Sequence, residues 1–309
     1  MRQEIKALLL IIIILPLLVA AVSLSRRSEV TPEITYPLVI RDDAGRTVKM
    51  QAEPRRIVSL APGNTEILFA LGLGERVVGV SEQCDYPVEA KEKSKVGGFT
   101  TISIEKVLSL KPDLVLASGS LQLQTADQLS DLGISTVVLD PKNVDGIMSD
   151  IELVGSISNK SVEARTLVRS MRDRVKAIVA VTQQTTSIPR VYYEVWHSPL
   201  MSVGQGTWIN ELIELSGGRN IFSDSSDPYP IISSELIIER DPEIIIISVG
   251  YMSGFAREEI SQRAGWDRIS AVKNGRIYEI DENILTRPGP RIVDGLEALA
   301  RVIHPELLR

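Results

Sequence analysis

The feature that most constrains this chain is a stretch of helical periodicity from Ser161 to about Gln184. Apolar residues recur there mostly at three- and four-residue steps, which places a stripe along one side of a helix. No Gly or Pro interrupts the stretch, and at about 1.5 Å per residue it would extend for roughly 35 Å. The stripe consists of Val162, Leu167, Val168, Met171, Val175, Ile178 and Val179. A long unbroken helix in mid-chain predicts a stiff spine that joins two folded parts.

Similar sequence lies on either side of the predicted spine. Residues 103–118 and 233–248 align without a gap at an offset of 130 positions. The matched positions are Ser103 and Ser233, Glu105 and Glu235, Pro112 and Pro242, Asp113 and Glu243, and Ser118 and Ser248. Each copy combines a helix N-cap, an acid in the first turn, a Pro break and a buried strand. The shared register favours two related lobes over a chance likeness of helix-Pro-strand units.

Strand-like and helix-like stretches alternate on both sides of the spine, so each lobe is expected to be α/β with a largely parallel sheet. The expected fold is therefore two Rossmann-like lobes joined by one long rigid helix, with a ligand cleft between the lobes. The expected boundaries are 36–143 for the N-terminal lobe, 144–187 for the linking helices including the spine 161–184, and 188–309 for the C-terminal lobe. Within that lobe, 196–199 and 283–290 are expected to be loops and 258–269 a helix.

The N-terminus is a separate element. Arg2 and Lys6 precede an uncharged run from Ala7 to Leu24, which is long for a signal-peptide core and just long enough to span a bilayer. Residues 1–24 are thus expected to be a membrane anchor or a cleaved signal peptide, and 25–35 a polar tether. Either interpretation places the remaining chain outside the cytoplasm. No Cys follows the apolar run, so no lipid-modified N-terminal Cys is expected.

The residue inventory argues against catalysis and against a resident metal. The chain has two histidines, His197 and His304, and one cysteine, Cys84, so neither a Cys cluster nor a His-rich metal site is expected. Cys84 is interpreted as a buried small residue. No nucleophile-base motif, phosphate-binding loop or complete dinucleotide fingerprint is present. A net charge of −6 without a basic run argues against nucleic acid as a partner. We therefore expect a protein that is not an enzyme and that carries no cofactor.

Aromatic residues mark the expected loops instead. Tyr86, Phe99, Trp196 and Tyr229 follow predicted strands, and ligands of α/β sheets lie outside the carboxyl ends of the strands. Flat rings suit a large, partly apolar, planar ligand, although core packing is the alternative for any one ring. Trp208, one residue into a helix, is expected to be core. Arg287, in Thr-Arg-Pro-Gly-Pro, is expected either to bind a ligand amide or acid or to form a salt bridge to a neighbouring loop.

Glu105 and Glu235 occupy equivalent places in the repeat, each in the first turn of a helix. One interpretation is simple complementarity with the helix dipole. The other is a symmetric pair of acids at the lobe tips that meets basic residues of a two-fold partner. Asn159-Lys-Ser161 matches a glycosylation acceptor, but a turn that caps a helix is the preferred interpretation.

Several stretches together resemble one family. They are Pro54-x-Arg56-Ile-Val-Ser-Leu, Asn64-Thr-Glu66, Gly79-Val-Ser, Asp85-Tyr-Pro87, Glu105-x4-Leu-Lys-Pro-Asp-Leu-Val and Gly218-x-Asn-Ile-Phe222. Over about residues 36–309 the chain resembles the helical-backbone substrate-binding proteins of ABC importers, which serve cobalamin, haem and ferric siderophores. The resemblance is greatest to the cobalamin-binding members.

The resemblance implies roles for single residues. The family's two glutamates that dock on arginines of the permease dimer fall on Glu105 and Glu235. Its corrin-contacting aromatics fall on Tyr86, Phe99 and Tyr229, the last two replacing Trp, and its C-terminal loop Arg falls on Arg287. A neighbouring Asp of that loop corresponds to Asn283. These departures leave the ligand open between a corrinoid and an iron chelate, which His197 or a tyrosine could reach.

The function expected from the sequence is capture of a corrinoid outside the cytoplasm and its delivery to an ABC permease dimer with its ATPase subunits. A ferric-siderophore or haem binder of the same family is the first alternative. A tethered ligand sensor, which would bind but not meet a permease, is the second. An enzyme or metal-centre assembly protein on a related two-lobed fold is the third, and it lacks a recognisable nucleophile or metal cluster.

Overall fold

The structure, a computed structural model, describes residues 35–250 and 257–307. Thr35–Arg309 forms one compact unit. The apolar run 7–24 and most of the predicted tether lie outside the described residues, and none of the helices described is long and apolar enough to cross a membrane.

The N-terminal lobe opens with an antiparallel hairpin and continues as a parallel sheet. The hairpin pairs β1 (Leu38–Arg41) with β2 (Thr47–Met50). Within the described residues the sheet has the order β5-β4-β3-β6-β7. Its strands are β3 (Ile57–Ser59), β4 (Val77–Val80), β5 (Ser94–Lys95), β6 (Leu114–Ser118) and β7 (Thr136–Leu139). Counted along the chain this is the order 3-2-1-4-5 of a Rossmann half, as predicted, with its switch point between β3 and β6.

Helices and turns connect these strands. They are α2 (Pro62–Ala70), η1 (Gly74–Arg76), η2 (Val88–Glu92), α3 (Ile104–Ser109), η3 (Ser120–Gln122), α4 (Leu123–Asp131) and α5 (Val144–Ile157). The central strands β3 and β6 are almost wholly buried, because helices cover both faces of a parallel sheet.

The C-terminal lobe repeats the scheme with the parallel order β11-β8-β12-β13 in its described part. Its strands are β8 (Arg190–Glu194), β11 (Arg219–Asn220), β12 (Ile244–Val249) and β13 (Ile277–Asp281), with a short hairpin of β9 (Trp196–His197) and β10 (Leu200–Met201). Its helices and turns are α7 (Trp208–Leu215), α8 (Ser234–Arg240), α9 (Arg257–Ser261), η4 (Trp266–Arg268), α10 (Ser270–Lys273), α11 (Glu282–Thr286) and α12 (Ile292–Ile303).

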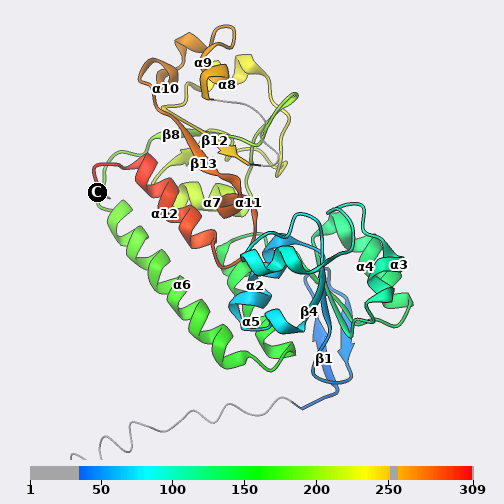
Figure 1. Ribbon diagram of the computed structural model, residues 1–309. Helices are drawn as coiled ribbons and strands as arrows, with labels where there is room; N and C mark the ends of the chain where they lie inside the picture. The colour runs from blue at the N-terminus through cyan, green and yellow to red at the C-terminus, as the bar shows by residue number, and fades with distance from the viewer. Residues whose placement is uncertain (1–34, 251–256, 308–309) are drawn as a thin grey trace, which may run out of the picture. The chain divides into compact units, whose positions relative to one another are not determined.

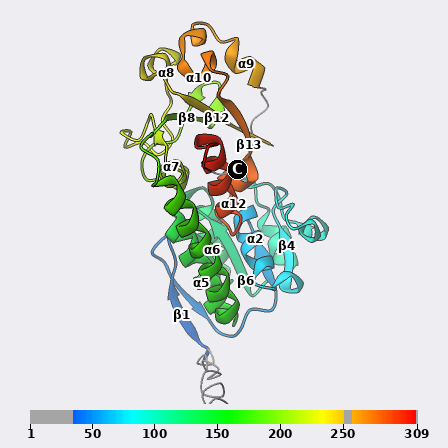
Figure 2. The same cartoon turned by 90° about the vertical axis from the view of Figure 1, so that its left-hand side faces the viewer.

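The predicted spine is the helix α6 (Ser161–Thr182). It packs on α5 of the first lobe and on α7 and α12 of the second, and Figures 1 and 2 both draw α12 beside it. Its buried residues are Ala164, Val168, Met171, Ile178 and Thr182. These steps of three, four and seven residues follow one face, and the same apolar cluster continues into both lobes. Val162, which the sequence placed in the stripe, is 53% exposed, because it lies roughly 200° around the helix from Ala164.

The internal repeat is visible as matching local structure. The side chain of Ser103 accepts a hydrogen bond from the backbone N–H of Lys106, and that of Ser233 accepts one from Leu236, both at 3.2 Å. Each cap starts a short helix, α3 or α8, and each helix is followed by a Pro and a buried strand. The two copies therefore place their strands, β6 and β12, at corresponding positions in the two sheets.

Three local expectations for the C-terminal lobe are wrong. Residues 196–201 form a tight hairpin rather than a loop, because Trp196 pairs with Met201 and His197 with Leu200. The helix expected over 258–269 is divided into α9 and η4 by Gly265, whose φ is +80°. Residues 282–286 are helical because the Asp281 side chain caps the Asn283 N–H at 2.9 Å. Pro288 then disfavours further helix.

Candidate functional site

The predicted ligand residues follow strands that all run in the same direction within their sheet. In the N-terminal lobe Tyr86 comes after β4 and Phe99 after β5. In the C-terminal lobe Trp196 comes after β8 and Tyr229 after β11, while Arg287 follows β13 through α11. Because the strands of each sheet are parallel, their carboxyl ends lie at one edge, where α/β proteins bind ligands.

The loop that carries Tyr86 is anchored at Cys84. The Cys84 thiol is 1% exposed and accepts a hydrogen bond from the Thr65 hydroxyl at 3.1 Å, while its carbonyl accepts one from Lys95 Nζ at 3.0 Å. Burial raises the pKa of this thiol, so it stays protonated and inert, as predicted. Two residues later Tyr86 is 46% exposed. The buried anchor at Cys84 therefore holds the loop in place, and the loop leaves the Tyr86 ring exposed.

Phe99 is held through its backbone. Gln122 Nε2 donates to the carbonyls of Phe99 at 2.7 Å and Leu60 at 2.9 Å, and Gln122 Oε1 accepts from the Ser118 N–H at 2.8 Å. Gln122 is buried at the switch point between β3 and β6. The loop before Phe99 turns at Gly97, whose φ is +122° and where a Cβ would collide with the Thr101 carbonyl. The Phe99 ring is half-buried in this arrangement.

The C-terminal lobe contributes Tyr229 and Trp196. Tyr229 is 42% exposed, and its N–H donates to Asp227 Oδ1 at 3.0 Å. Burial raises the pKa of the Tyr229 hydroxyl, and the charge of Asp140 raises it further. Asp140 directly follows β7 of the other lobe, so the Tyr229 hydroxyl lies close enough to the carboxyl edge of the N-terminal sheet to interact with its charge. The Trp196 indole N–H donates to the Ser198 carbonyl at 2.9 Å within the hairpin.

Ion pairs join the two lobes beside Tyr86. Arg287 donates to Asp85 Oδ1 at 2.6 Å, and although partial burial acts in the opposite direction, this hydrogen bond and charge hold the pKa of Asp85 below its usual range. Arg291 donates to both carboxylate oxygens of Glu66, at 2.6 and 2.9 Å. The structure thus gives Arg287 the salt bridge to a neighbouring loop that the sequence left as one of two options.

Two other predicted residues have local structural roles. Asn283 Nδ2 donates to Asp281 Oδ1 at 2.8 Å, which strengthens the cap of α11. The Trp208 indole donates to the Leu285 carbonyl at 2.9 Å and packs against the main core, as expected for Trp208. Asn283 is half-buried, so a part of its side chain still borders solvent.

Glu105 and Glu235 are both exposed, in the first turns of α3 and α8. Within residues 35–250 and 257–307, neither carboxylate has a hydrogen bond or an ion pair. Exposed acids that have no partner among these residues are available to basic groups of another protein.

Sequence reasoning missed Glu66, Asp85 and Arg291 as members of the inter-lobe contact. Glu66 lies in a stretch that carries the family resemblance, but a single sequence gives no sign that it meets a residue 225 positions away. It also missed two exposed aliphatic side chains next to the aromatic loops, Leu121 at 72% and Ile231 at 67% exposure. A sequence shows that these two residues are apolar, but it does not show that their side chains are exposed to solvent.

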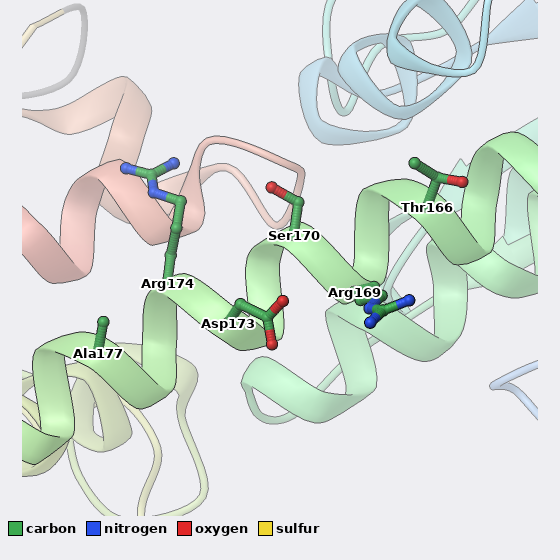
Figure 3. A pocket seen from close by; sticks show the side chains of 6 residues that line it. All are labelled: Thr166, Arg169, Ser170, Asp173, Arg174 and Ala177. Carbon is green, nitrogen blue, oxygen red and sulfur yellow. The ribbon is translucent and has the colours of Figure 1, made fainter. Parts of the chain in front are cut away.

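Surface hollows lie elsewhere on the chain. One of about 490 Å³ runs along the solvent side of α6 and is lined by that helix alone (Figure 3). One wall cannot enclose a ligand, and Arg174 within it already pairs with Asp294 at 2.8 Å and Glu297 at 3.1 Å. Among the residues that the structure describes, no cluster of His, Cys, Asp and Glu has the arrangement of a metal site.

A family model and two curated relatives assign the chain to the same family of proteins. The family model described as "Periplasmic binding protein" matches residues 57–284. An uncharacterized ABC transporter substrate-binding lipoprotein of Bacillus subtilis is 36% identical over 89% of this chain and 88% of its own. A vitamin B12-binding protein of Vibrio cholerae is 35% identical over 81% of this chain and 91% of its own.

Solved structures agree on the architecture. The periplasmic vitamin B12-binding protein of Vibrio cholerae superposes with a TM-score of 0.72 at 32% identity, covering 82% of this chain and 97% of that one. A periplasmic haem-binding protein from Roseiflexus superposes with a TM-score of 0.74 at 26% identity, covering 81% and 98%. The predicted two-lobed α/β fold is thereby confirmed.

Proposed function

Because this chain belongs to the periplasmic binding protein family, we propose that it captures a corrinoid of the cobalamin type and delivers it to an ABC importer. Membership makes the chain an extracytoplasmic substrate-binding component of transport, which binds a solute rather than transforming it. The corrinoid is the proposed ligand, and an ABC permease dimer with its ATPase subunits is the proposed partner.

The observation that carries the proposal is a pair of exposed tyrosines, one from each lobe. Tyr86 and Tyr229 follow the carboxyl ends of β4 and β11 and are 46% and 42% exposed. Tyrosine is enriched at binding interfaces because its ring packs on a partner while its hydroxyl stays hydrated, so two open rings on loops at the sheet edges suit a ligand surface. Phe99 and Trp196 flank them on the same sheet edges, and Asn283 and Arg287 supply polar groups. Relatives at about one-third identity that bind vitamin B12 favour a corrinoid among planar ligands.

An iron ligand is the alternative within the same site. Solved relatives include a haem-binding protein, and His197 is exposed next to Trp196 in the β9–β10 hairpin. An imidazole there would serve as an axial ligand for a haem iron. Binding of haem in place of a corrinoid would keep the transport role and move the specificity to His197.

Delivery distinguishes a transport protein from a tethered sensor. The two exposed acids Glu105 and Glu235 belong to equivalent helices of the two lobes, which suits a permease dimer that offers basic groups twice. Residues 7–24 are proposed to keep the protein at the outer side of the membrane if they remain uncleaved. Cys84, the one cysteine of the sequence, is buried and cannot carry a lipid anchor.

Alanine substitution of the two tyrosines tests the site. Tyr86→Ala and Tyr229→Ala are each expected to weaken cyanocobalamin binding about ten- to a hundred-fold, because each ring loses roughly 100 Å² of apolar contact with the ligand. Equilibrium dialysis of the purified full chain measures the affinities.

Leu132→Ala is the matched control, because Leu132 is 55% exposed at the end of α4 and does not belong to the loops that carry the tyrosines. Its affinity should equal that of the wild type. Unchanged affinity in both tyrosine variants would place the ligand elsewhere on the molecule.

A further inference from the structure

A continuous series of contacts leads from a buried carboxylate to an exposed ring. Glu66 on α2 has a side chain that is 1% exposed. Arg291, which directly precedes α12, donates from Nε to Glu66 Oε2 at 2.9 Å and from Nη2 to Glu66 Oε1 at 2.6 Å. The guanidinium carbon of Arg291 lies 3.9 Å from the centroid of the Tyr86 ring. The series thus crosses from the N-terminal lobe to the C-terminal lobe and back.

The edge and the face of the Arg291 guanidinium are fixed in different ways. Paired hydrogen bonds to one carboxylate orient a guanidinium plane, because both groups are flat and rigid. A guanidinium 3.9 Å from a ring centroid covers one face of that ring. Tyr86 is nevertheless 46% exposed, so its open surface lies away from Arg291.

The two neighbouring arginines differ in how firmly they are held. Arg291 forms two hydrogen bonds of 2.6 and 2.9 Å with the buried carboxylate of Glu66. Arg287 reaches Glu66 only at 3.6 Å, and its short contact of 2.6 Å is with Asp85, whose side chain is 48% exposed. An exposed pair is worth little and is readily exchanged for another partner. Breaking a buried pair is costly because it leaves a charge uncompensated. Exchanging the Asp85 contact of Arg287 for a contact with a ligand therefore costs less than breaking the paired hydrogen bonds between Arg291 and Glu66.

We propose that Arg291 is a positioning residue for ligand binding: anchored by Glu66, it stacks on one face of Tyr86 and holds the ring so that its other face meets a planar ligand. Arg291 does not touch the ligand in this arrangement. The adjacent Arg287 is the arginine that turns toward the ligand. This inference rests on the proposed function and adds to it a residue that selects for flat ligands.

The test is a double-mutant cycle in the full chain with cyanocobalamin, and in parallel with haemin, as the planar probes. Arg291→Lys keeps the charge and can still pair with Glu66, but it lacks the flat surface that stacks on the ring. Binding is expected to weaken about three- to ten-fold. In a Tyr86→Leu background the same change is expected to have almost no further effect, since the ring it positions is absent.

A merely structural role would give a different pattern, because a loosened lobe contact would weaken binding equally with and without the Tyr86 ring. Additive losses, or an Arg291→Lys variant that binds like the wild type, would overturn the proposal. Arg301→Lys is the matched control and should leave affinity unchanged, because Arg301 lies on the helix that follows Arg291 and pairs with Glu297 at 2.6 Å.

A second variant tests the same role of Arg291 in case the Arg291→Lys variant does not fold. Glu66→Gln keeps the size of the anchor and removes its charge, so it should loosen Arg291 and weaken binding in the same direction, again only when Tyr86 is present. Wild-type chain that binds neither planar probe would contradict the proposed function itself. Wild-type binding without coupling between positions 291 and 86 would contradict only the role of Arg291.

Discussion

Replacement of both Glu105 and Glu235 by alanine is expected to abolish uptake while leaving ligand affinity unchanged. Each carboxylate is exposed in the first turn of a short helix, and neither has a partner within the described residues. Loss of one such acid from a helix N-terminus costs only about 0.3–1 kcal/mol of stability. A failure of transport would therefore reflect a lost interaction with the permease rather than an unfolded protein.

Uptake of radiolabelled cyanocobalamin by cells that carry the cognate importer measures the effect, and titration of the purified variant measures affinity. Glu239→Ala, which removes an exposed acid from the last turn of α8, is the matched control and should support normal uptake. Uptake that survives the double substitution would contradict the docking assignment. An equal fall in affinity would instead make these acids part of the ligand site.

The second large effect concerns stability at alkaline pH. Asp150 lies on α5 and is 4% exposed. Burial, together with the nearby charge of Asp43, a hydrogen bond to the Asp43 side chain and the charge of Asp140, raises the pKa of Asp150 to about 9. The native chain therefore holds a proton on Asp150 at neutral pH, whereas an unfolded aspartate releases its proton near pH 4.

The sign of the pH dependence follows from that extra proton. Where the folded state binds more protons than the unfolded state, the free energy of unfolding falls as pH rises, by about 1.4 kcal/mol per unit for one proton. This contribution acts between roughly pH 4 and pH 9. The Asp150→Asn variant cannot ionise, and its amide can still donate to Asp43. It is expected to lose this slope and to be more stable than the wild type at pH 8.

Urea unfolding at pH 6, 7 and 8 checks this expectation. Asp131→Asn, at an exposed aspartate that ends α4, should keep the wild-type slope. Parallel pH profiles for the wild type and Asp150→Asn would contradict a protonated, buried Asp150.

The sequence allowed the architecture to be predicted because the relevant signals are local. The 3.6-residue periodicity of 161–184 and the N-cap serines of the repeat depend on neighbours within a turn or two. The spine, the parallel strands and the start of α3 and α8 are confirmed for that reason. Where local signals were short, as around Gly265 and Asp281, the predicted elements were wrong in extent.

The site was predictable only as a set of loops. The carboxyl ends of parallel strands share one edge of a sheet, so the sequence alone groups the loops that carry Tyr86, Phe99, Trp196 and Tyr229. The partners that organise them could not. Arg291 and Glu66 are separated by 225 positions, and one sequence contains no information on which distant charges pair. The roles proposed for the loop residues, for Asn283 and Arg287 and for the two surface acids remain predictions.

The measurement that tests the central claim most directly is calorimetric titration of the purified chain with cyanocobalamin, haemin and a ferric siderophore. The proposal predicts submicromolar binding of cyanocobalamin, with weaker or no binding of the two iron ligands. Binding of an iron ligand alone would contradict the corrinoid assignment and direct attention to His197 and the tyrosines. Binding of none of the three would contradict the proposed ligand class altogether.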